Sequence, residues 1–194
     1  QMNRGSSSID ITSIMTGGEI GGLLRYRSTV LDPAMNELGR VALVVADQMN
    51  SLQAQGIDKN GDFGSTLFNS INSAAQVAQR SIATIGNNAG TGNFDVTIED
   101  SGKLTTSDYK VTFTSATDYT VQRLPGNTPV GGTYSTTTTP PPVIDGFSLN
   151  LKGGTPAPGN TATAGDTFKI TPTRNAAANI KTEMTDSKRL AIAA

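Results

Sequence analysis

The sequence predicts an α+β protein in which a helical, rod-like bundle carries an inserted antiparallel β-sandwich or open barrel. Three observations lead to this prediction. Apolar residues recur every three or four positions in the first part of the chain, they alternate with polar residues in short runs through the middle, and alanine-rich sequence returns near the end. We therefore expect a split helical domain at 1–90 and 174–194, with a β-rich outer domain at 91–173.

A short strand and a first helix are expected before Pro33. Ile9 and Ile11 alternate with polar residues, which is typical of a strand. After Gly17 and Gly18, helical spacing begins, and it includes Ile20, Leu23, Leu24, Arg27 and Val30.

The strongest local pattern is the start of a second helix at 32–55. The Asp32 side chain suits the N-cap, where it accepts from free backbone amides, and Pro33 suits the first helical position. Gly56 can adopt the left-handed conformation that ends a helix.

This second helix carries an apolar seam at alternating spacings of three and four residues, the pattern of a coiled-coil heptad. The seam consists of Leu31, Met35, Leu38, Ala42, Val45, Met49 and Leu52. For a single helix, the simpler interpretation is that the seam packs inside its own domain. The alternative is that it joins a helical bundle in a polymer, with Asn36, Arg40, Asp47 and Gln48 free on other faces to meet neighbouring subunits.

A third helix is expected at 65–85, because apolar residues again recur at threes and fours. They are Leu67, Ile71, Ala74, Ala75, Ala78, Ile82 and Ile85. The glycine- and asparagine-rich stretch at 86–92 then predicts a hinge and the first domain boundary.

Five alternating runs predict half-buried strands in the middle of the chain. They are Phe94, Val96 and Ile98; Tyr109, Val111 and Phe113; Tyr119 and Val121; Phe147, Leu149 and Leu151; and Phe168 with Ile170. Turn-forming residues, not helices, separate them, which favours antiparallel pairing. The threonine- and proline-rich stretch at 134–142 predicts an exposed, extended loop.

Composition removes most enzyme and cofactor chemistry. The chain has no Cys and no His, so thiol nucleophiles, imidazole bases and nearly all zinc, copper and haem sites are excluded. Its formal net charge of -1 does not favour nucleic acid or an anionic membrane. The longest strongly apolar run, at 41–46, is too short to span a bilayer. We expect no catalytic residue, metal or cofactor.

Two motifs invite a chemical role that their surroundings do not support. The stretch 58–62 has the first, third and fifth ligands of a calcium loop, but Phe63 stands where glycine is needed and Asn69 where glutamate should close the site. We expect a tight Asx turn instead. Glu99 and Asp100 form a carboxylate pair, but neighbours on a strand point to opposite faces. The glycine pair at 153–154 lacks the context of a phosphate loop.

The helical motifs together resemble the flagellar hook-associated protein 1 family of axial proteins. The motifs are GGEIGGLLRYR at 17–27, LDPA at 31–34, NELGR at 36–40, QGID at 55–58, NG at 60–61 and PTRNAA at 172–177. The resemblance covers roughly residues 9–194, and the strand-rich part matches in style and placement.

This resemblance implies a structural subunit of the secreted, extracellular flagellum, at the junction between hook and filament. It implies a ring of copies in the full-length protein, contacts with neighbouring hook and junction proteins, and export through the flagellar type III apparatus, which suits the polar start of the chain at 1–8. The family's terminal helices have no counterpart here, so we expect the isolated chain to be a monomer.

Two other functions stay open from the sequence. The strands could form an extracellular recognition or adhesin module on a helical stalk, provided that Tyr109, Tyr119 or Tyr134 cluster on an exposed face. A carboxylate-based hydrolase would depend on Glu99 and Asp100.

Overall fold

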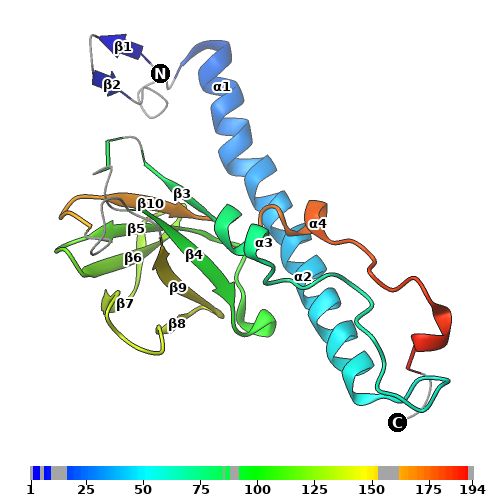
Figure 1. Ribbon diagram of the computed structural model, residues 1–194. Helices are drawn as coiled ribbons and strands as arrows, with labels where there is room; N and C mark the ends of the chain where they lie inside the picture. The colour runs from blue at the N-terminus through cyan, green and yellow to red at the C-terminus, as the bar shows by residue number, and fades with distance from the viewer. Residues whose placement is uncertain are drawn as a thin grey trace.

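The computed structural model describes residues 2–4, 7–9, 17–84, 86–87, 92–152 and 162–191. One long helix runs along the molecule, and two sheets lie against one side of it (Figure 1). We call these two sheets the β unit. The polypeptide that leaves the β unit after β10, at 171–191, runs along the helix toward the end where the helix itself stops, and we call it the returning segment.

The long helix is continuous across the point where the sequence predicts a new start. It comprises α1 (Gly18–Tyr26), the π turn η1 (Arg27–Leu31) and α2 (Asp32–Gln55). Leu31 has helical dihedral angles and α2 has no side-chain cap, so the predicted N-cap role of Asp32 is wrong. The predicted end is correct at Gln55, but Gly56 is extended, with φ −95° and ψ 168°, and not left-handed.

The π turn explains how the helix tolerates Pro33. Proline has no backbone N–H and its ring crowds the carbonyl four residues earlier, which is Thr29. In the π turn the Asp32 backbone N–H donates to the Arg27 carbonyl, five residues back, so the turn widens at this point. The Thr29 hydroxyl also donates to the Arg25 carbonyl, a local bond that favours bending.

The helix predicted at 65–85 is largely wrong. Within its described part, 65–84, only α3 (Ala74–Gln79) is helical, and β3 (Ser81–Ala83) already belongs to a sheet. The Asn50 side chain of α2 accepts from the backbone N–H groups of Leu67 and Phe68 and donates to the Phe68 carbonyl. Because these backbone groups are satisfied by a side chain of another helix, the segment stays extended.

All strand pairs among the described residues are antiparallel, as predicted. The first sheet has the order β3-β10-β5-β6-β7, with β10 at Thr167–Ile170, β5 at Asp108–Phe113, β6 at Asp118–Leu124 and β7 at Thr128–Ser135. The second has the order β4-β9-β8, with β4 at Asn93–Ile98, β9 at Phe147–Lys152 and β8 at Val143–Ile144. Each of the five predicted runs lies in a strand of these two sheets, whereas their strands β3, β7 and β8 were not predicted.

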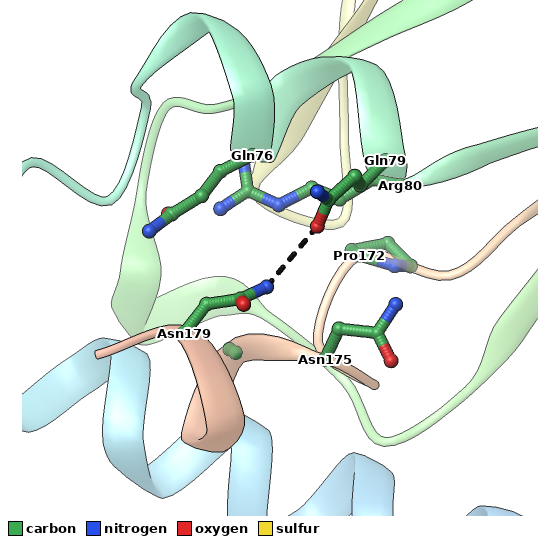
Figure 2. A pocket seen from close by; sticks show the side chains of 7 residues that line it. Gln76, Gln79, Arg80, Pro172, Asn175 and Asn179 are labelled. Carbon is green, nitrogen blue, oxygen red and sulfur yellow. Dashed lines mark hydrogen bonds between the residues drawn. The ribbon is translucent and has the colours of Figure 1, made fainter. Parts of the chain in front are cut away.

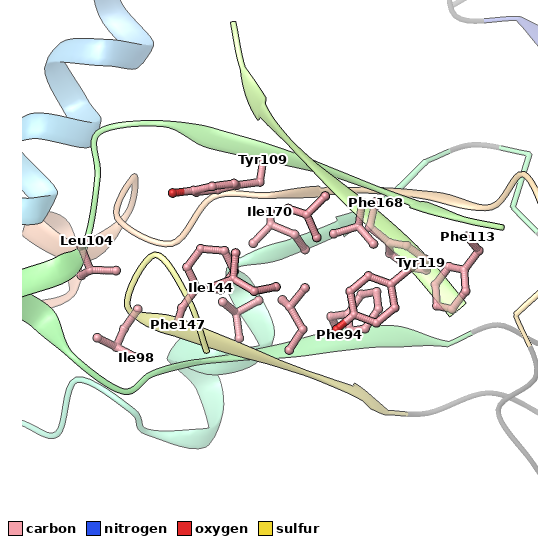
Figure 3. Packing of buried hydrophobic residues seen from close by; sticks show 14 of the residues in the cluster. Phe94, Ile98, Leu104, Tyr109, Phe113, Tyr119, Ile144, Phe147, Phe168 and Ile170 are labelled. Atoms are coloured by element: carbon pink, nitrogen blue, oxygen red, sulfur yellow. The ribbon is translucent and has the colours of Figure 1, made fainter. Parts of the chain in front are cut away.

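The core of the β unit is aromatic (Figure 3). Phe94 packs against Phe113, Phe168 and Tyr119, with ring centroids 5.8, 5.1 and 5.6 Å away. Most inward positions of the two sheets are fully buried, while Val130, Tyr134 and Leu151 are partly buried against the same core, which is the pattern of a sandwich. The α+β prediction is therefore confirmed.

The remaining elements are short. At the N-terminus β1 (Met2–Arg4) pairs with β2 (Ser7–Ile9). The turn η2 (Ser101–Lys103) follows β4, and α4 (Ala176–Asn179) and η3 (Ser187–Arg189) lie on the returning segment. Ile11, Ile85, residues 88–91 of the predicted hinge and the 153–154 glycines lie outside the described residues.

Candidate assembly surface

One face of α2 is buried against the β unit and the returning segment, and it is mostly small or polar. Its buried residues are Asn36, Gly39, Leu43, Ala46 and Gln53. A Cβ on Gly39 would lie 1.8 Å from the Thr173 carbonyl oxygen, so the two backbones touch because residue 39 has no side chain. This face of α2 therefore packs against other parts of the same chain.

The apolar seam lies on a different face, which the described residues leave largely uncovered. The exposed fractions of Leu38, Leu52 and Val45 are 62%, 60% and 48%, and those of Leu31 and Met35 are 44% and 38%. Ala42 and Met49 are half-buried. Within the described ranges, therefore, the seam does not pack inside its own domain as the simpler interpretation expects.

The exposed apolar face continues into α1. Ile20, Leu23 and Tyr26 are each more than half exposed. An α-helix turns by about 100° per residue, so the extra residue in the π turn rotates α1 by about that angle relative to α2. By this geometry the π turn brings Leu23 and Tyr26 into line with Leu31 and Leu38.

Two residues expected to be free for neighbouring subunits are engaged inside the molecule. The Asn36 amide donates to the Asp108 carboxylate and to the Thr106 carbonyl, both at 3.0 Å. Asp47 accepts from the Ser101 hydroxyl at 2.6 Å. The expectation for Asn36 and Asp47 is therefore wrong, because they tie the helix to the β unit. Arg40 pairs with Glu37 on the same helix, and Gln48 is exposed.

The stretch 58–62 forms the expected Asx turn. Asp58 Oδ1 accepts from the backbone N–H groups of Asn60 and Asp62, at 2.7 and 3.1 Å, and Gly61 has φ +89°. Among the residues that the structure describes, no group of three or more acidic side chains could hold a metal ion. The Asp58 oxygens thus serve the backbone of the turn.

The same turn exposes a pair of apolar side chains just after the C-terminal end of the long helix. The Asp58 N–H donates to the Asp62 carbonyl and the Gly64 N–H to the Gly56 carbonyl. Ile57 and Phe63 are therefore a pair without mutual hydrogen bonds, whose side chains lie close together on one side. Phe63 is 73% exposed and Ile57 41%. Sequence reasoning missed this pair, although Phe63 is a large apolar residue beside a predicted turn.

Glu99 and Asp100 have separate structural roles. Glu99 accepts from the Ser148 hydroxyl at 2.6 Å, across the β4–β9 pair. Asp100 accepts from the Gly102 N–H and pairs with Lys103 at 2.9 Å. The two carboxylates therefore do not face a common cleft.

Arg80 is one of the residues that line a small crevice between α3 and α4 (Figure 2). It donates to the carbonyls of Ile71 and Val96 and to the Asn72 side chain. Burial lowers the pKa of Arg80 to about 10. The crevice has a volume of only about 10 Å³, so it holds at most a single water. Arg80 is thus a structural crosslink.

A carboxylate in the β8–β9 turn is held by two partners. Asp145 accepts from Arg123 Nε at 2.8 Å and Nη2 at 2.7 Å, and from the Tyr109 hydroxyl at 2.7 Å. The hydrogen bonds from Arg123 lower the pKa of Asp145, burial opposes this, and the bond from Tyr109 adds to it.

Asp145→Asn should cost about 1–2 kcal/mol of unfolding free energy at pH 7, since a charged hydrogen-bonded pair is lost. A lowered folded-state pKa stabilises above the unfolded pKa of about 3.9, and that contribution disappears as pH falls through the folded value. Urea unfolding at several pH values should show the gap between wild type and variant shrinking below about pH 4. The longer pair Lys152–Asp95, at 3.8 Å and with an exposed Lys152, is the control, and Asp95→Asn should cost less than 1 kcal/mol. A gap for Asp145→Asn that does not depend on pH would contradict this assignment.

No helix in the described ranges is both long and apolar enough to cross a bilayer.

Comparison with known proteins gives the chain its family. Residues 1–68 match the family described as Flagellar hook-associated protein FlgK helical domain, and residues 83–172 match Flagellar hook-associated protein 1, D2-like domain. The chain belongs to the flagellar hook-associated protein 1 family. The resemblance stated from the helical motifs is confirmed.

Curated members of the hook-associated protein 1 family match almost the whole chain. The Escherichia coli (strain K12) protein is 29% identical over 184 residues, and the Salmonella typhimurium (strain LT2) protein is 31% identical over 181. Each match covers 93% of this chain but 30% of the relative. The chain thus spans about a third of the length of these hook-associated proteins.

A solved structure of the same family has the same fold. It is described as the flagellar hook junction protein FlgK from Burkholderia pseudomallei, and it is 34% identical. The match covers 90% of this chain and 29% of that one, with a TM-score of 0.73. The long helix and the β unit are therefore shared with a hook-associated protein 1.

Proposed function

We propose that this chain is part of a non-enzymatic structural subunit that forms the junction between the hook and the filament of the extracellular bacterial flagellum. The observation that carries the proposal is the exposed apolar face from Ile20 to Leu52 on the long continuous helix. Membership of the hook-associated protein 1 family supports it.

The seam is the assembly surface in this proposal. Leu31, Leu38, Val45 and Leu52 recur at heptad spacing and are exposed, so they present knobs and holes to a partner helix. The partners are other copies of the subunit in a ring and neighbouring hook and junction proteins. We propose flagellar export and an extracellular location on the same family grounds.

We propose a domain organisation in which one part of the chain packs and the other projects. A helical part at 1–90 and 174–194 supplies the packing surface, and a β-rich part at 91–173 projects from it. The β3 strand, at Ser81–Ala83, crosses over from the helical part and pairs with β10. The β-rich part is therefore attached by a strand as well as by the chain connections.

The recognition-module alternative has little support in the β unit. It requires exposed tyrosines on one face, but Tyr109 and Tyr119 are buried in the core and Tyr134 is half-buried and stacked on Tyr119. Burial raises the pKa of Tyr119 to about 12, which suits a core position.

A charge on the seam should prevent assembly without unfolding the chain. We expect Leu38→Asp in the full-length protein to leave its thermal unfolding nearly unchanged, since the side chain is 62% exposed, and to abolish motility in a strain that lacks the protein. Swimming assays and electron microscopy of the hook tip are the readouts.

The control is Ser51→Asp, at an exposed position on the opposite side of α2. This variant should swim. Normal motility with Leu38→Asp would show that the seam is not the assembly surface. Loss of motility with both variants would show that any added negative charge on this helix has the same effect.

A further inference from the structure

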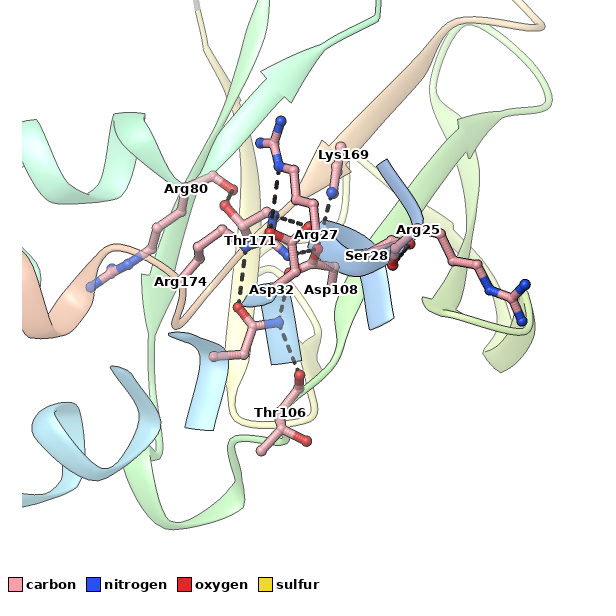
Figure 4. Close-up of polar contacts among 11 residues, drawn as sticks. Arg25, Arg27, Ser28, Asp32, Arg80, Thr106, Asp108, Lys169, Thr171 and Arg174 are labelled. Atoms are coloured by element: carbon pink, nitrogen blue, oxygen red, sulfur yellow. Dashed lines mark hydrogen bonds and ion pairs between the residues drawn. The ribbon is translucent and has the colours of Figure 1, made fainter. Parts of the chain in front are cut away.

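We propose that Arg174, Asp32 and Asp108 form a latch that holds the β unit against the long helix, and that releasing it lets the β unit tilt. Arg174 Nη1 lies 2.8 Å from an Asp32 oxygen, and Nη2 pairs with Asp108 (Figure 4). One guanidinium therefore bridges a carboxylate of α2 and a carboxylate of β5.

The polar partners around the latch are arranged so that each charge is compensated. Lys169 of β10 lies 3.1 Å from Asp108, and Arg27 lies 3.7 Å from Asp32. The Asn36 side chain donates to Asp108 and accepts from Arg174 Nε at 3.3 Å. Contacts from the helix, from two strands and from the segment after β10 thus meet at one point.

The latch is shielded from water. The exposed fractions of the side chains of Asp108, Arg174 and Asp32 are 7%, 12% and 15%. Removing one member of such a cluster leaves the others charged and poorly solvated, so the cluster favours a single arrangement of helix and β unit. Surface ion pairs with the same geometry would not do this.

The surroundings leave room for movement once the latch opens. A cleft of about 220 Å³ borders it, lined by Ser28 and Pro33 of the helix and by Leu124 and Pro125 of the β unit. Further along α2, Gly39 touches Thr173 and the fully buried Leu43 packs into the core, so these contacts act as a pivot. The Ser101–Asp47 hydrogen bond lies beyond the pivot. Opening the latch would widen the cleft while Leu43 stays in place.

A distance measurement across the cleft tests the latch. The chain has no cysteine, so Arg25→Cys on α1 and Thr128→Cys at the start of β7, both exposed, give two unique spin-label sites in the full chain. Pulsed electron resonance should give one narrow distance distribution with the latch intact. Adding Arg174→Met should broaden the distribution and shift it to longer distances, with circular dichroism unchanged.

Two further variants make the outcome decisive. Lys152→Met removes a cation from an exposed pair and should leave the distribution as in wild type. Asp32→Asn weakens the latch on the helix side only, and it decides the case if Arg174→Met does not fold. Distributions identical to wild type in the folded latch variants would overturn the proposal. Because the readout is a distance within one molecule, it does not depend on junction assembly.

Discussion

Gly39→Ala should destabilise the fold by about 2–4 kcal/mol, although alanine is the better helix former. The new Cβ would lie 1.8 Å from the Thr173 oxygen and 2.8 Å from the Thr173 carbonyl carbon, both of them backbone atoms. The helix and the returning segment would have to separate, which also disturbs the neighbouring Ala176 and Leu43. Urea unfolding followed by circular dichroism measures the change.

Gly22→Ala is the matched control for this substitution. It lies in α1, and a Cβ there would meet nothing within 4 Å. Since alanine loses less backbone entropy than glycine in a helix, the variant should gain about 0.5–1 kcal/mol. If Gly39→Ala were as stable as Gly22→Ala, helix and returning segment would not be in backbone contact.

Phe94→Ala should cost about 3–5 kcal/mol of unfolding free energy. Phe94 is 1% exposed and contacts three other core aromatic rings, so the substitution leaves a cavity that joins both sheets. The rings are held by strands on opposite sides of the core and can collapse only in part. Equilibrium denaturation checks the magnitude.

The exposed phenylalanine provides the comparison for this core variant. Phe63→Ala removes the same atoms at a position that is 73% exposed, so it should change stability by less than about 0.5 kcal/mol. Similar losses for the two variants would contradict the assignment of Phe94 to the core or of Phe63 to the surface.

The strands were predictable because a half-buried strand has a strict period of two. Phe94, Val96 and Ile98 all point into the core, as do Val111 and Phe113. By contrast, β7 contains Pro129 and two glycines and lies at a sheet edge, where few side chains are buried. An edge strand of this kind has no apolar alternation to detect.

The helix predicted at 65–85 failed because spacing alone does not choose between helix and extended chain. Asn50, Asn69 and Asn72 bind backbone groups across distances that no local pattern encodes. The π turn could not be predicted for a related reason, because Asp32 followed by Pro33 is the usual pattern at the start of a helix. Only the continuous helix upstream shows that proline here sits in the interior.

The residues of the apolar seam could be identified from the sequence, but their exposure could not. The heptad spacing identifies the seam, whereas its exposure depends on a β unit that packs on the neighbouring, polar face of α2. Asn36 and Asp47 were expected to face neighbours and instead bind the β unit, because polar side chains on a helix give no sign of which partner they meet.

Cysteine protection at the seam tests the central claim most directly. In a full-length protein with Leu38→Cys as its only cysteine, a maleimide should react rapidly with the purified chain, where this position is 62% exposed. In isolated hook–filament junctions the same cysteine should be protected, while Ser51→Cys on the opposite side of α2 serves as the reference. Equal reactivity of Leu38→Cys before and after assembly would contradict the claim that this helical face is an assembly surface.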